Sequence, residues 1–454
     1  MITATWGRIR ARAAALANDD VMAKLARGGM AALIIKIGGA GLSFLMFLML
    51  ARAMSAEEYG RFGFAFSLAT LLAVVGSFGF RSLVLRYAAA YAADGAIELE
   101  RGVIRHGYVV TALGCGVLGL GVAIFAAFVP GVSHPSYLIA AGAFTLVLGL
   151  AEYQASVMRA ITGITLSLVP RDIIWRLLVV AGCGLVTIEL FPQLTATSGT
   201  ILIAAVLLVV LLGQALAHPM TRPGPLITGP VQSERKKWWS SVGSLWGTLI
   251  VRSSAPNLAV VYLGFVMSPA ATGTFFAALQ LSVAMNLFLM SSGIVVAPAI
   301  ARHFHRREID SVRNLCLVTV SAVAIPTIII FAAFLIFGHQ ILGLFGDGFE
   351  NGYTALLILS AGNLVNALSG PTIPMMEMTG SERPYFRIIL ATNITALLLI
   401  AVLTPIWGTV GAAIAVAFAT SAWNVGCIAY CRKNLGVDPS ILSIFPSARR
   451  QKKG

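Results

Sequence analysis

Arg252 is the residue whose type and position point most directly to chemistry. It lies about eleven residues inside an apolar stretch that starts near residue 241. At a helical rise of about 1.5 Å per residue, this is roughly 16 Å from the start of the stretch. A guanidinium at that depth in a membrane either lines a water-filled cavity, where it can bind an anion, or pairs with a polar neighbour. Arginine suits phosphate because its planar fork of donors binds two oxygens at once.

Three further cations have two interpretations each. Lys36 lies about two turns inside the first apolar stretch, so it either faces a cavity or extends its long side chain back to the nearer surface. Arg52 and Arg86 lie near opposite ends of the first helical hairpin. They either anchor the protein at the membrane surfaces or line the outer and inner mouths of an anion path.

Acidic and amide residues complete the candidate site. Glu152 is the one acid well inside a span, where it either pairs with a cation or carries a coupling proton. Asn363 and Asn366 either hold neighbouring helices together or contact a sugar. There is no Walker loop, metal-ligand cluster or nucleophile elbow. We therefore expect no catalytic residue, no metal and no cofactor, and leave coupling to a proton or sodium gradient open.

Composition places these residues in a membrane protein. Hydrophobic residues make up 58% of the 454 residues, charged residues make up 11%, and the mean hydropathy is +0.87. These values exclude an ordinary soluble enzyme. Long apolar stretches recur, and each can cross the roughly 30 Å hydrocarbon core as a helix. They lack the alternation of barrel strands.

We predict an all-α polytopic membrane protein with twelve transmembrane helices. Their approximate ranges are 30–50, 62–84, 108–129, 136–157, 173–190, 199–217, 241–264, 274–298, 314–337, 352–374, 387–404 and 408–430.

Basic residues orient these helices. On this assignment 28 of the 32 Lys and Arg residues fall in the termini and the even-numbered connections, and only Arg52 and Arg61 fall on the other side. Cytoplasmic loops retain Lys and Arg, so we expect both termini in the cytoplasm. The same asymmetry explains the net charge of +14 without a nucleic-acid partner.

The chain contains an internal repeat. MSAEEYGRFGFAFSL at Met54–Leu68 lines up with MSPAATGTFFAALQL at Met267–Leu281, 213 residues later, with six identities in fifteen positions. Later span starts follow the same offset to within a turn or two. We therefore expect two six-helix lobes in the same orientation, related by a pseudo-two-fold axis along the membrane normal, with the site between them.

The predicted organisation has five parts. They are a basic cytoplasmic segment (1–29), an N-terminal lobe (30–217), a Pro- and Gly-rich cytoplasmic linker that lets the lobes tilt (218–240), a C-terminal lobe (241–431) and a basic cytoplasmic tail (432–454).

The first hairpin resembles that of bacterial polysaccharide flippases, the O-antigen and exopolysaccharide exporters of the multidrug/oligosaccharidyl-lipid/polysaccharide superfamily. The similarity rests on LARAMSAEEYGRFGFAFSLATLLAVVGSFGFRSLVLRYAA, with its Ala-Arg helix end, short Ser-Glu-Tyr-Gly turn, and Phe-Gly and Arg-Tyr pairs. The later stretches APNLAVVYLGF, GTFFAALQL and VVAPAIARHF are similar to the start of that family's second lobe.

The resemblance implies a function. Such proteins flip a polyprenyl-pyrophosphate-linked oligosaccharide from the cytoplasmic to the outer leaflet of the bacterial cytoplasmic (inner) membrane by alternating access. Lys36, Arg52 and Arg252 become substrate-binding cavity cations. The implied partners are the lipid-linked oligosaccharide, membrane lipids, a polysaccharide polymerase and glycosyltransferases. Twelve spans differ from the fourteen of peptidoglycan lipid-precursor flippases, so the resemblance does not extend to that subgroup.

Three alternatives stay open. A cation-coupled multidrug exporter of the same superfamily should favour acids in its cavity, whereas cations outnumber Glu152 here. A membrane glycan polymerase or ligase should carry catalytic residues in a large outer loop, and the predicted outer loops are short. A scaffold within a synthesis complex would not need Arg252.

Overall fold

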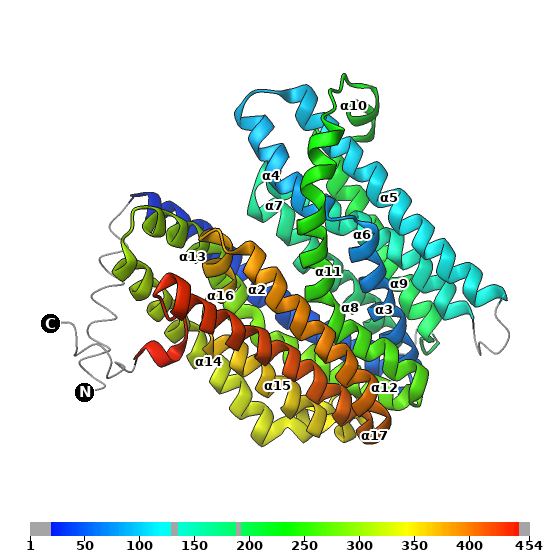
Figure 1. Cartoon of the computed structure of the whole chain (residues 1–454). Coiled ribbons are helices and arrows are strands. Elements are labelled where there is room, and N and C mark those ends of the chain that lie inside the picture. The colour runs from blue at the N-terminus through cyan, green and yellow to red at the C-terminus, as the bar shows by residue number, and fades with distance from the viewer. Residues whose placement is uncertain (1–19, 129–134, 188–191, 445–454) are drawn as a thin grey trace.

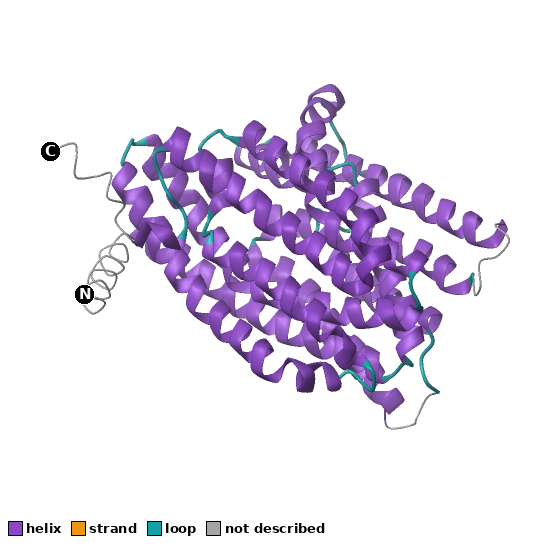
Figure 2. Ribbon diagram, turned by 60° about the horizontal axis from the view of Figure 1, so that its bottom comes forward, coloured by secondary structure: helices purple, strands orange, loops and turns teal. Residues whose placement is uncertain are grey.

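The computed structural model describes residues 20–128, 135–187 and 192–444, and within them it contains helices and no strand (Figure 2). The long helices are α2 (Asp20–Arg52), α3 (Ala56–Gly76), α4 (Phe80–Ala93), α5 (Ile97–Phe128), α6 (Ser136–Thr162), α8 (Trp175–Thr187), α9 (Ala196–Leu216), α11 (Arg235–Val266), α12 (Pro269–Val283), α13 (Leu287–His305), α14 (Ile309–Gly343), α15 (Tyr353–Leu368) and α17 (Glu382–Tyr430). The short elements are α7 (Ile164–Leu168), η1 (Val169–Ile174), α10 (Pro223–Thr228), η2 (Ala284–Asn286), η3 (Phe349–Gly352), α16 (Thr372–Met378), η4 (Cys431–Leu435) and η5 (Ile441–Ile444).

The two copies of the repeat begin their second helices in the same way. Ser55 caps α3 by accepting a hydrogen bond from the backbone N–H of Glu58 at 3.3 Å. Ser268 caps α12 by accepting one from Ala271, also at 3.3 Å. Serine is a favoured N-cap because its hydroxyl satisfies a donor that the helix leaves free. Both caps obey the 213-residue offset, so the sequence repeat is also a structural repeat.

The helices fall into two groups. We call α3 to α9 the N-terminal lobe and α12 to α17 the C-terminal lobe, because most helix contacts lie within these sets. Helices α2 and α11 correspond under the repeat offset, and each packs against both lobes. α2 contacts α8 and η1 in one lobe and α13 in the other, while α11 contacts α3 and α4 in one and α17 in the other.

The lobes meet where α3 packs on α12. A Cβ atom added to Gly60 would strike the carbonyl of Pro269, and one added to Gly273 would lie 2.9 Å from the carbonyl of Ala56. Under the offset, Gly60 corresponds to Gly273 and Ala56 to Pro269. Gly60 therefore contacts the copy of Ala56, and the copy of Gly60 contacts Ala56 itself. This is the reciprocal pattern that the predicted two-fold axis requires.

Aromatic rings fill the space around this glycine contact. Phe276 lies 5.5 Å from Phe47 and 5.7 Å from Tyr59 between ring centroids, and Tyr59 lies 5.5 Å from Phe349. We call α3, α12 and these rings the seam. Figure 1 shows the lobes converging there and diverging toward α10 in one lobe and α13 in the other. The diverging ends form what we call the basic side, which carries the connections after α4, α9, α13 and α16.

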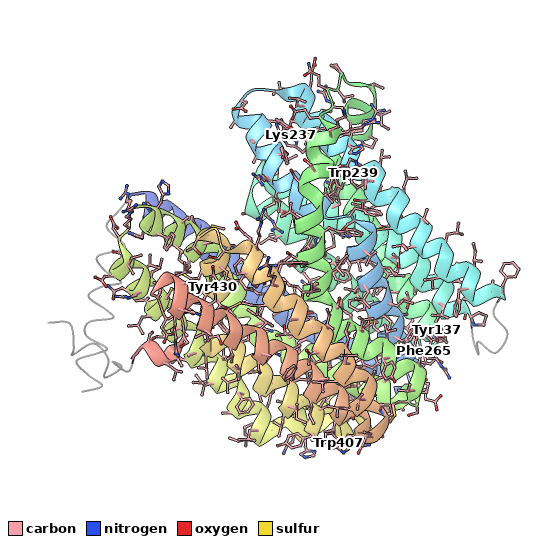
Figure 3. All side chains as sticks on the ribbon, in the orientation of Figure 1. Tyr137, Lys237, Trp239, Phe265, Trp407 and Tyr430 are labelled. Atoms are coloured by element: carbon pink, nitrogen blue, oxygen red, sulfur yellow. The ribbon has the colours of Figure 1, made fainter. Side chains whose placement is uncertain are left out.

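Helix α11 runs from one lobe to the other across this gap. At its basic-side end Trp238 is fully buried and donates from Nε1 to the hydroxyl of Tyr91, at 3.1 Å. At the other end Tyr262 donates to the carbonyl of Ala401 in α17, at 3.4 Å. Figure 3 shows Lys237 and Trp239 at the first end of the helix, and Phe265 at the other, near Tyr137.

The number of spans differs from the prediction at two places. Nine described helices are long and apolar enough to cross a membrane, or ten if α15 and α16 form one span bent by 47°. Helix α17 contains two predicted spans. Gly408 interrupts it with φ 58° and ψ −133°, and the halves fold back, because a Cβ on Gly426 would lie 2.8 Å from Ile388 Cγ2. Of the predicted span 173–190 the structure describes residues 173–187, where the short α8 follows a π-helical turn. The twelve-span count stays a prediction.

Three boundaries also differ from those expected. The predicted span 62–84 breaks between α3 and α4, because Ser77, Phe78 and Gly79 lie outside both helices and Phe78 and Gly79 have positive φ. The end of the predicted linker is already helical, since α11 begins at Arg235. The predicted basic segment is described only from Asp20, where α2 begins, and its residues 1–19 and tail residues 445–454 lie outside the described chain.

The linker is packed on the N-terminal lobe rather than extended. Arg101 and Arg105 of α5 donate to the carbonyls of Pro230 and Ile227, at 2.9 and 3.0 Å. The backbone N–H of Gln232 donates to the backbone carbonyl of Glu98, at 3.0 Å. A change in lobe angle must therefore be taken up within α11 and α2, which touch both lobes.

Candidate functional site

A cavity of about 640 Å³ opens beside the C-terminal lobe, with Arg252 in its wall. This volume lies in the range of ligand pockets. Most of its wall comes from α11 to α17, and Arg159 of α6 supplies the contribution of the N-terminal lobe. The structure thus places Arg252 at a cavity, the first of the two positions that the sequence left open. That the cavity binds an anion stays a prediction.

The local sequence around Arg252 interrupts the backbone hydrogen bonding of α11. Pro256 lies inside the helix and has no N–H to donate to the carbonyl four residues earlier, which is that of Arg252 itself. Ser254 donates to the carbonyl of Ile250 at 2.7 Å, and Asn257 to that of Ser253 at 3.0 Å. These short polar side chains satisfy backbone groups within the helix and leave the Arg252 guanidinium exposed in the cavity.

Arg159 is the second cation of the cavity wall. It lies in the last turn of α6 with an exposed side chain. Within the described part of the chain, neither Arg159 nor Arg252 makes a hydrogen bond or an ion pair. Two guanidinium groups with free donors, one from α6 of the N-terminal lobe and one from α11, therefore face the same space.

A chain of asparagines reaches the cavity, and three of its members, Asn286, Asn363 and Asn366, belong to the cavity wall. Asn363 donates to the carbonyl of Ser282 at 3.0 Å, and Asn286 donates to Asn363 at 2.8 Å. Asn366 donates to Asn286 at 2.8 Å, and Asn424 donates to Asn366 at 2.9 Å. We call this set the asparagine ladder. The predicted residues Asn363 and Asn366 therefore join helices and line the cavity at once, so the two interpretations are not exclusive.

The sequence did not single out three polar or aromatic residues of the wall. Glu377 lies on α16, after the chain breaks at Gly370 with φ 72°. Tyr385 and Trp423 come from the two halves of α17, with ring centroids 6.3 Å apart. The Gly-Pro pair at 370–371 signals a helix break, and a span ending there would have placed Glu377 on a separate segment.

Lys36 and Glu152 belong to a different region, the N-terminal charge cluster. Its members are Lys36, Arg81, Glu152, Arg171, Asp172 and Arg176. Lys36 lies 2.6 Å from Asp172, whose side chain is 4% exposed. Lys36 is therefore paired with an acid in this structure, and its predicted substrate-binding role stays untested.

The remaining cations of the cluster close around the same two acids. Arg171 donates from Nε to Glu152 at 2.9 Å and also pairs with Asp172 at 3.2 Å. Arg81 lies 3.5 Å from Glu152, and Arg176 lies 3.4 Å from Asp172. Glu152 is therefore an ion-pair partner, one of the two roles predicted for it.

Arg52 and Arg86 lie away from the cavity wall. Arg52 donates to the carbonyl of Leu344, which joins α2 to the C-terminal lobe at the seam end of the molecule. Arg86 is exposed on α4 with its guanidinium 5.9 Å from the ring centroid of Tyr87. Their predicted roles at the mouths of an anion path are untested. In the described residues no three His, Cys, Asp or Glu side chains come together as metal ligands would.

Comparison with known families identifies the chain. The family model described as polysaccharide biosynthesis protein matches residues 25–304, more than half of the sequence. The protein belongs to this family. Comparison with curated proteins gives no match. The polysaccharide biosynthesis match covers the N-terminal lobe, α11, α12 and most of α13.

Solved structures share the fold of this family member at low sequence identity. An inward-facing multidrug resistance MATE family transporter of the MOP superfamily superposes with a TM-score of 0.70 at 11% identity, over 90% of this chain and 98% of that one. An outward-facing structure of such a transporter gives 0.61 at 12% identity, over 90% and 95%. The Lipid II flippase MurJ in an inward closed conformation gives 0.67 at 14% identity, over 89% and 88%. The chain thus has the fold of multi-pass transporters.

Proposed function

We propose that this protein flips a polyprenyl-pyrophosphate-linked oligosaccharide across a membrane. The observation that carries the proposal is the cavity with Arg159 and Arg252, which make no hydrogen bond or ion pair in the described chain. Two free guanidinium groups fit a pyrophosphate, which offers several oxygens to bidentate donors. Cations inside a membrane are costly, so their lack of fixed partners favours a mobile anionic ligand.

The arrangement of the lobes supports alternating access. The seam closes one end of the space between the lobes, while they diverge at the basic side (Figure 1). A headgroup enters from the basic side, its phosphates bind the guanidiniums, and its sugars lie along the asparagine ladder. The polyprenyl tail stays in lipid. Rearrangement of α2 and α11 then opens the seam and releases the headgroup on the other side. No bond is made or broken.

Orientation and partners follow from this proposal. The basic side faces the cytoplasm of a bacterium and holds both termini, because Lys and Arg are retained there. An inside-negative potential then favours outward movement of an anion by about 2.3 kcal/mol per charge per 100 mV. Glycosyltransferases supply the lipid-linked oligosaccharide and a polymerase uses it after flipping, for surface polysaccharide export.

The test is transport by the purified protein in proteoliposomes. The probe is a polyprenyl pyrophosphate carrying a labelled oligosaccharide, placed in one leaflet, with its arrival in the other measured by an impermeant sugar-modifying enzyme. We expect flipping faster than in protein-free vesicles, and faster than for the same lipid with a neutral headgroup. Equal rates for the anionic and neutral lipids would contradict an anion site.

A cation-coupled drug exporter is the second candidate. It is favoured by the likeness to the MATE fold and by Glu377, the one acid in the described cavity wall. A cavity that binds organic cations should have an excess of acids, and here two arginines face one glutamate. Export of ethidium driven by an imposed proton or sodium gradient, with no flipping of the anionic lipid, would favour this candidate.

A further inference from the structure

Glu377 is held in the cavity wall without a fixed partner. Its neighbours Met375 and Met376 are fully buried in the C-terminal lobe, which anchors α16 and leaves Glu377 half-buried at the cavity. Within the described residues, Glu377 makes no hydrogen bond and no ion pair. A carboxylate so placed has to be compensated by charges that lie near but not in contact.

The charged and titratable groups around Glu377 come from three directions. Arg252 of α11 exerts the strongest charge influence on it, with Glu382 at the start of α17 acting in the opposite sense. Tyr385 of α17 lies near both Arg252 and Glu377. From α13, which packs on α16, Gly293 and Ala297 reach the cavity, while Arg302, His303 and His305 lie in its last turn. Arg252 is thus the cation that compensates Glu377.

We propose that Glu377 is an internal counter-ion that competes with the anionic headgroup for Arg252. The proposal rests on the flippase function above and assigns to that site the residue that limits its affinity. In the empty cavity Glu377 offsets the charge of Arg252. When phosphate oxygens bind the guanidinium of Arg252, the Glu377 carboxylate lies in the same cavity as a second anion. The repulsion between the carboxylate and the phosphate weakens binding of the headgroup.

Such a competitor suits a carrier rather than a storage site. A transporter must bind its cargo tightly enough to load it and weakly enough to release it on the other side. A headgroup fully neutralised by Arg159 and Arg252 would dissociate slowly. Glu377 speeds its release because the carboxylate can take the place of the phosphate beside Arg252. Because binding free energies are reciprocal, a proton on Glu377 and a bound headgroup favour one another.

The test measures binding of farnesyl pyrophosphate to the full-length protein in nanodiscs at pH 8 and at pH 5.5. Protonation removes the negative charge of Glu377, so on acidification wild-type binding should tighten relative to Glu377→Gln, which has no carboxylate to protonate. Glu377→Gln removes that charge at both pH values. We expect it to bind about tenfold more tightly than wild type at pH 8 and to show less tightening at pH 5.5. Titration of the ligand itself affects all variants alike.

Two variants control for less specific effects. Asp347→Asn removes an exposed carboxylate of the C-terminal lobe that lies outside the cavity wall, and it should bind like wild type. Glu377→Asp keeps the charge and should retain both the weaker binding and the pH response. If Glu377→Gln does not fold, Glu377→Asp still tests the proposal, because affinity that rises while the charge is kept would contradict a counter-ion role.

The outcomes separate this inference from the proposed function. No binding to wild type at either pH would contradict the flippase site itself. Binding that is lost in Arg252→Ala but unchanged in Glu377→Gln would support the site and overturn the counter-ion. Weaker binding in Glu377→Gln would also overturn it, because the carboxylate would then hold the ligand rather than compete with it.

Discussion

The N-terminal charge cluster and the cavity both place cations inside a helix bundle, yet they satisfy them in different ways. In the cluster, four cations close around Glu152 and Asp172 at 2.6–3.5 Å, which ties α2, α4, α6, η1 and α8 together. In the cavity, Arg159 and Arg252 face open space without a direct partner among the described residues, Glu377 lies in the same wall, and the asparagine amides bind one another. Both regions use arginines. A cation with a fixed acidic partner stabilises the structure, whereas a cation without one is available to bind a ligand.

The comparison predicts that breaking the cluster costs stability most. Asp172→Asn leaves Lys36, Arg171 and Arg176 without the charge that they share. Losing one partner of a buried network should cost about 3–5 kcal/mol of unfolding free energy. The apparent Tm of the detergent-purified protein should fall sharply.

A matched control for this variant is Asp310→Asn. Asp310 pairs with Arg313 at 2.9 Å but is 90% exposed, so its loss should cost less than about 1 kcal/mol. Equal Tm values for the two variants would mean that the cluster is not structural.

Arg252→Ala should do the reverse, leaving stability unchanged and removing transport. Loss of charge-assisted hydrogen bonds worth about 2–3 kcal/mol corresponds to roughly 30- to 150-fold weaker binding. Flipping in proteoliposomes and export in cells should be abolished at a normal protein level. Arg252→Lys keeps the charge without the planar fork and should retain part of the activity. Normal export by the alanine variant would refute the anion site.

Glu152→Gln lies between these two cases. The amide can still accept a hydrogen bond from Arg171 but no longer offsets Arg81 and Arg171, so we expect a loss of about 1–2 kcal/mol in stability. Transport should be reduced only in part. Complete loss of transport at unchanged Tm would instead indicate that Glu152 carries a coupling proton.

Asn366→Ala interrupts the asparagine ladder at its centre. It removes the donor to Asn286 and the acceptor for Asn424, at a cost of about 1 kcal/mol shared between stability and binding. A modest rise in the KM for flipping would support contact with the headgroup. As a reference, Asn351→Ala changes an exposed asparagine of η3 and should alter neither quantity.

Arg86→Ala should have the smallest effect. The side chain is exposed, and its one described contact is with the ring of Tyr87. The free energy of unfolding should change by less than about 0.5 kcal/mol. The Tm and the rate of transport should therefore stay close to those of wild type. A large loss of transport would place Arg86 on the substrate path and weaken the distinction between cavity and surface cations.

The sequence predicted those features that depend on local pattern. Apolar length predicted a multi-pass helical protein, and the offset of 213 residues predicted which turns correspond, as the matching caps at Ser55 and Ser268 show. Depth along an apolar stretch pointed to Arg252, because a lone cation far from either end has few structural explanations.

Features that depend on distant segments could not be predicted in this way. Lys36 and Asp172 are 136 residues apart, and no spacing rule links them. Arg159 and Arg171 were counted with the loops, because a cation at a helix end looks the same whether it faces lipid headgroups or a cavity. Glu377 was missed because the predicted span 352–374 ran through the break at Gly370, which hid the separate orientation of α16.

The reciprocal contact of Gly60 and Gly273 has a consequence for how the molecule moves. There the lobes touch through bare peptide groups and aromatic rings, and Arg52 binds a neutral carbonyl rather than an acid. Among the described residues, separating these surfaces exposes backbone groups to water and breaks no ion pair, so the rate of separation should barely respond to ionic strength. Separation should respond to side-chain size at the two glycines. An alanine at Gly60 or Gly273 would place a methyl group against the other lobe and favour the state in which the seam is open.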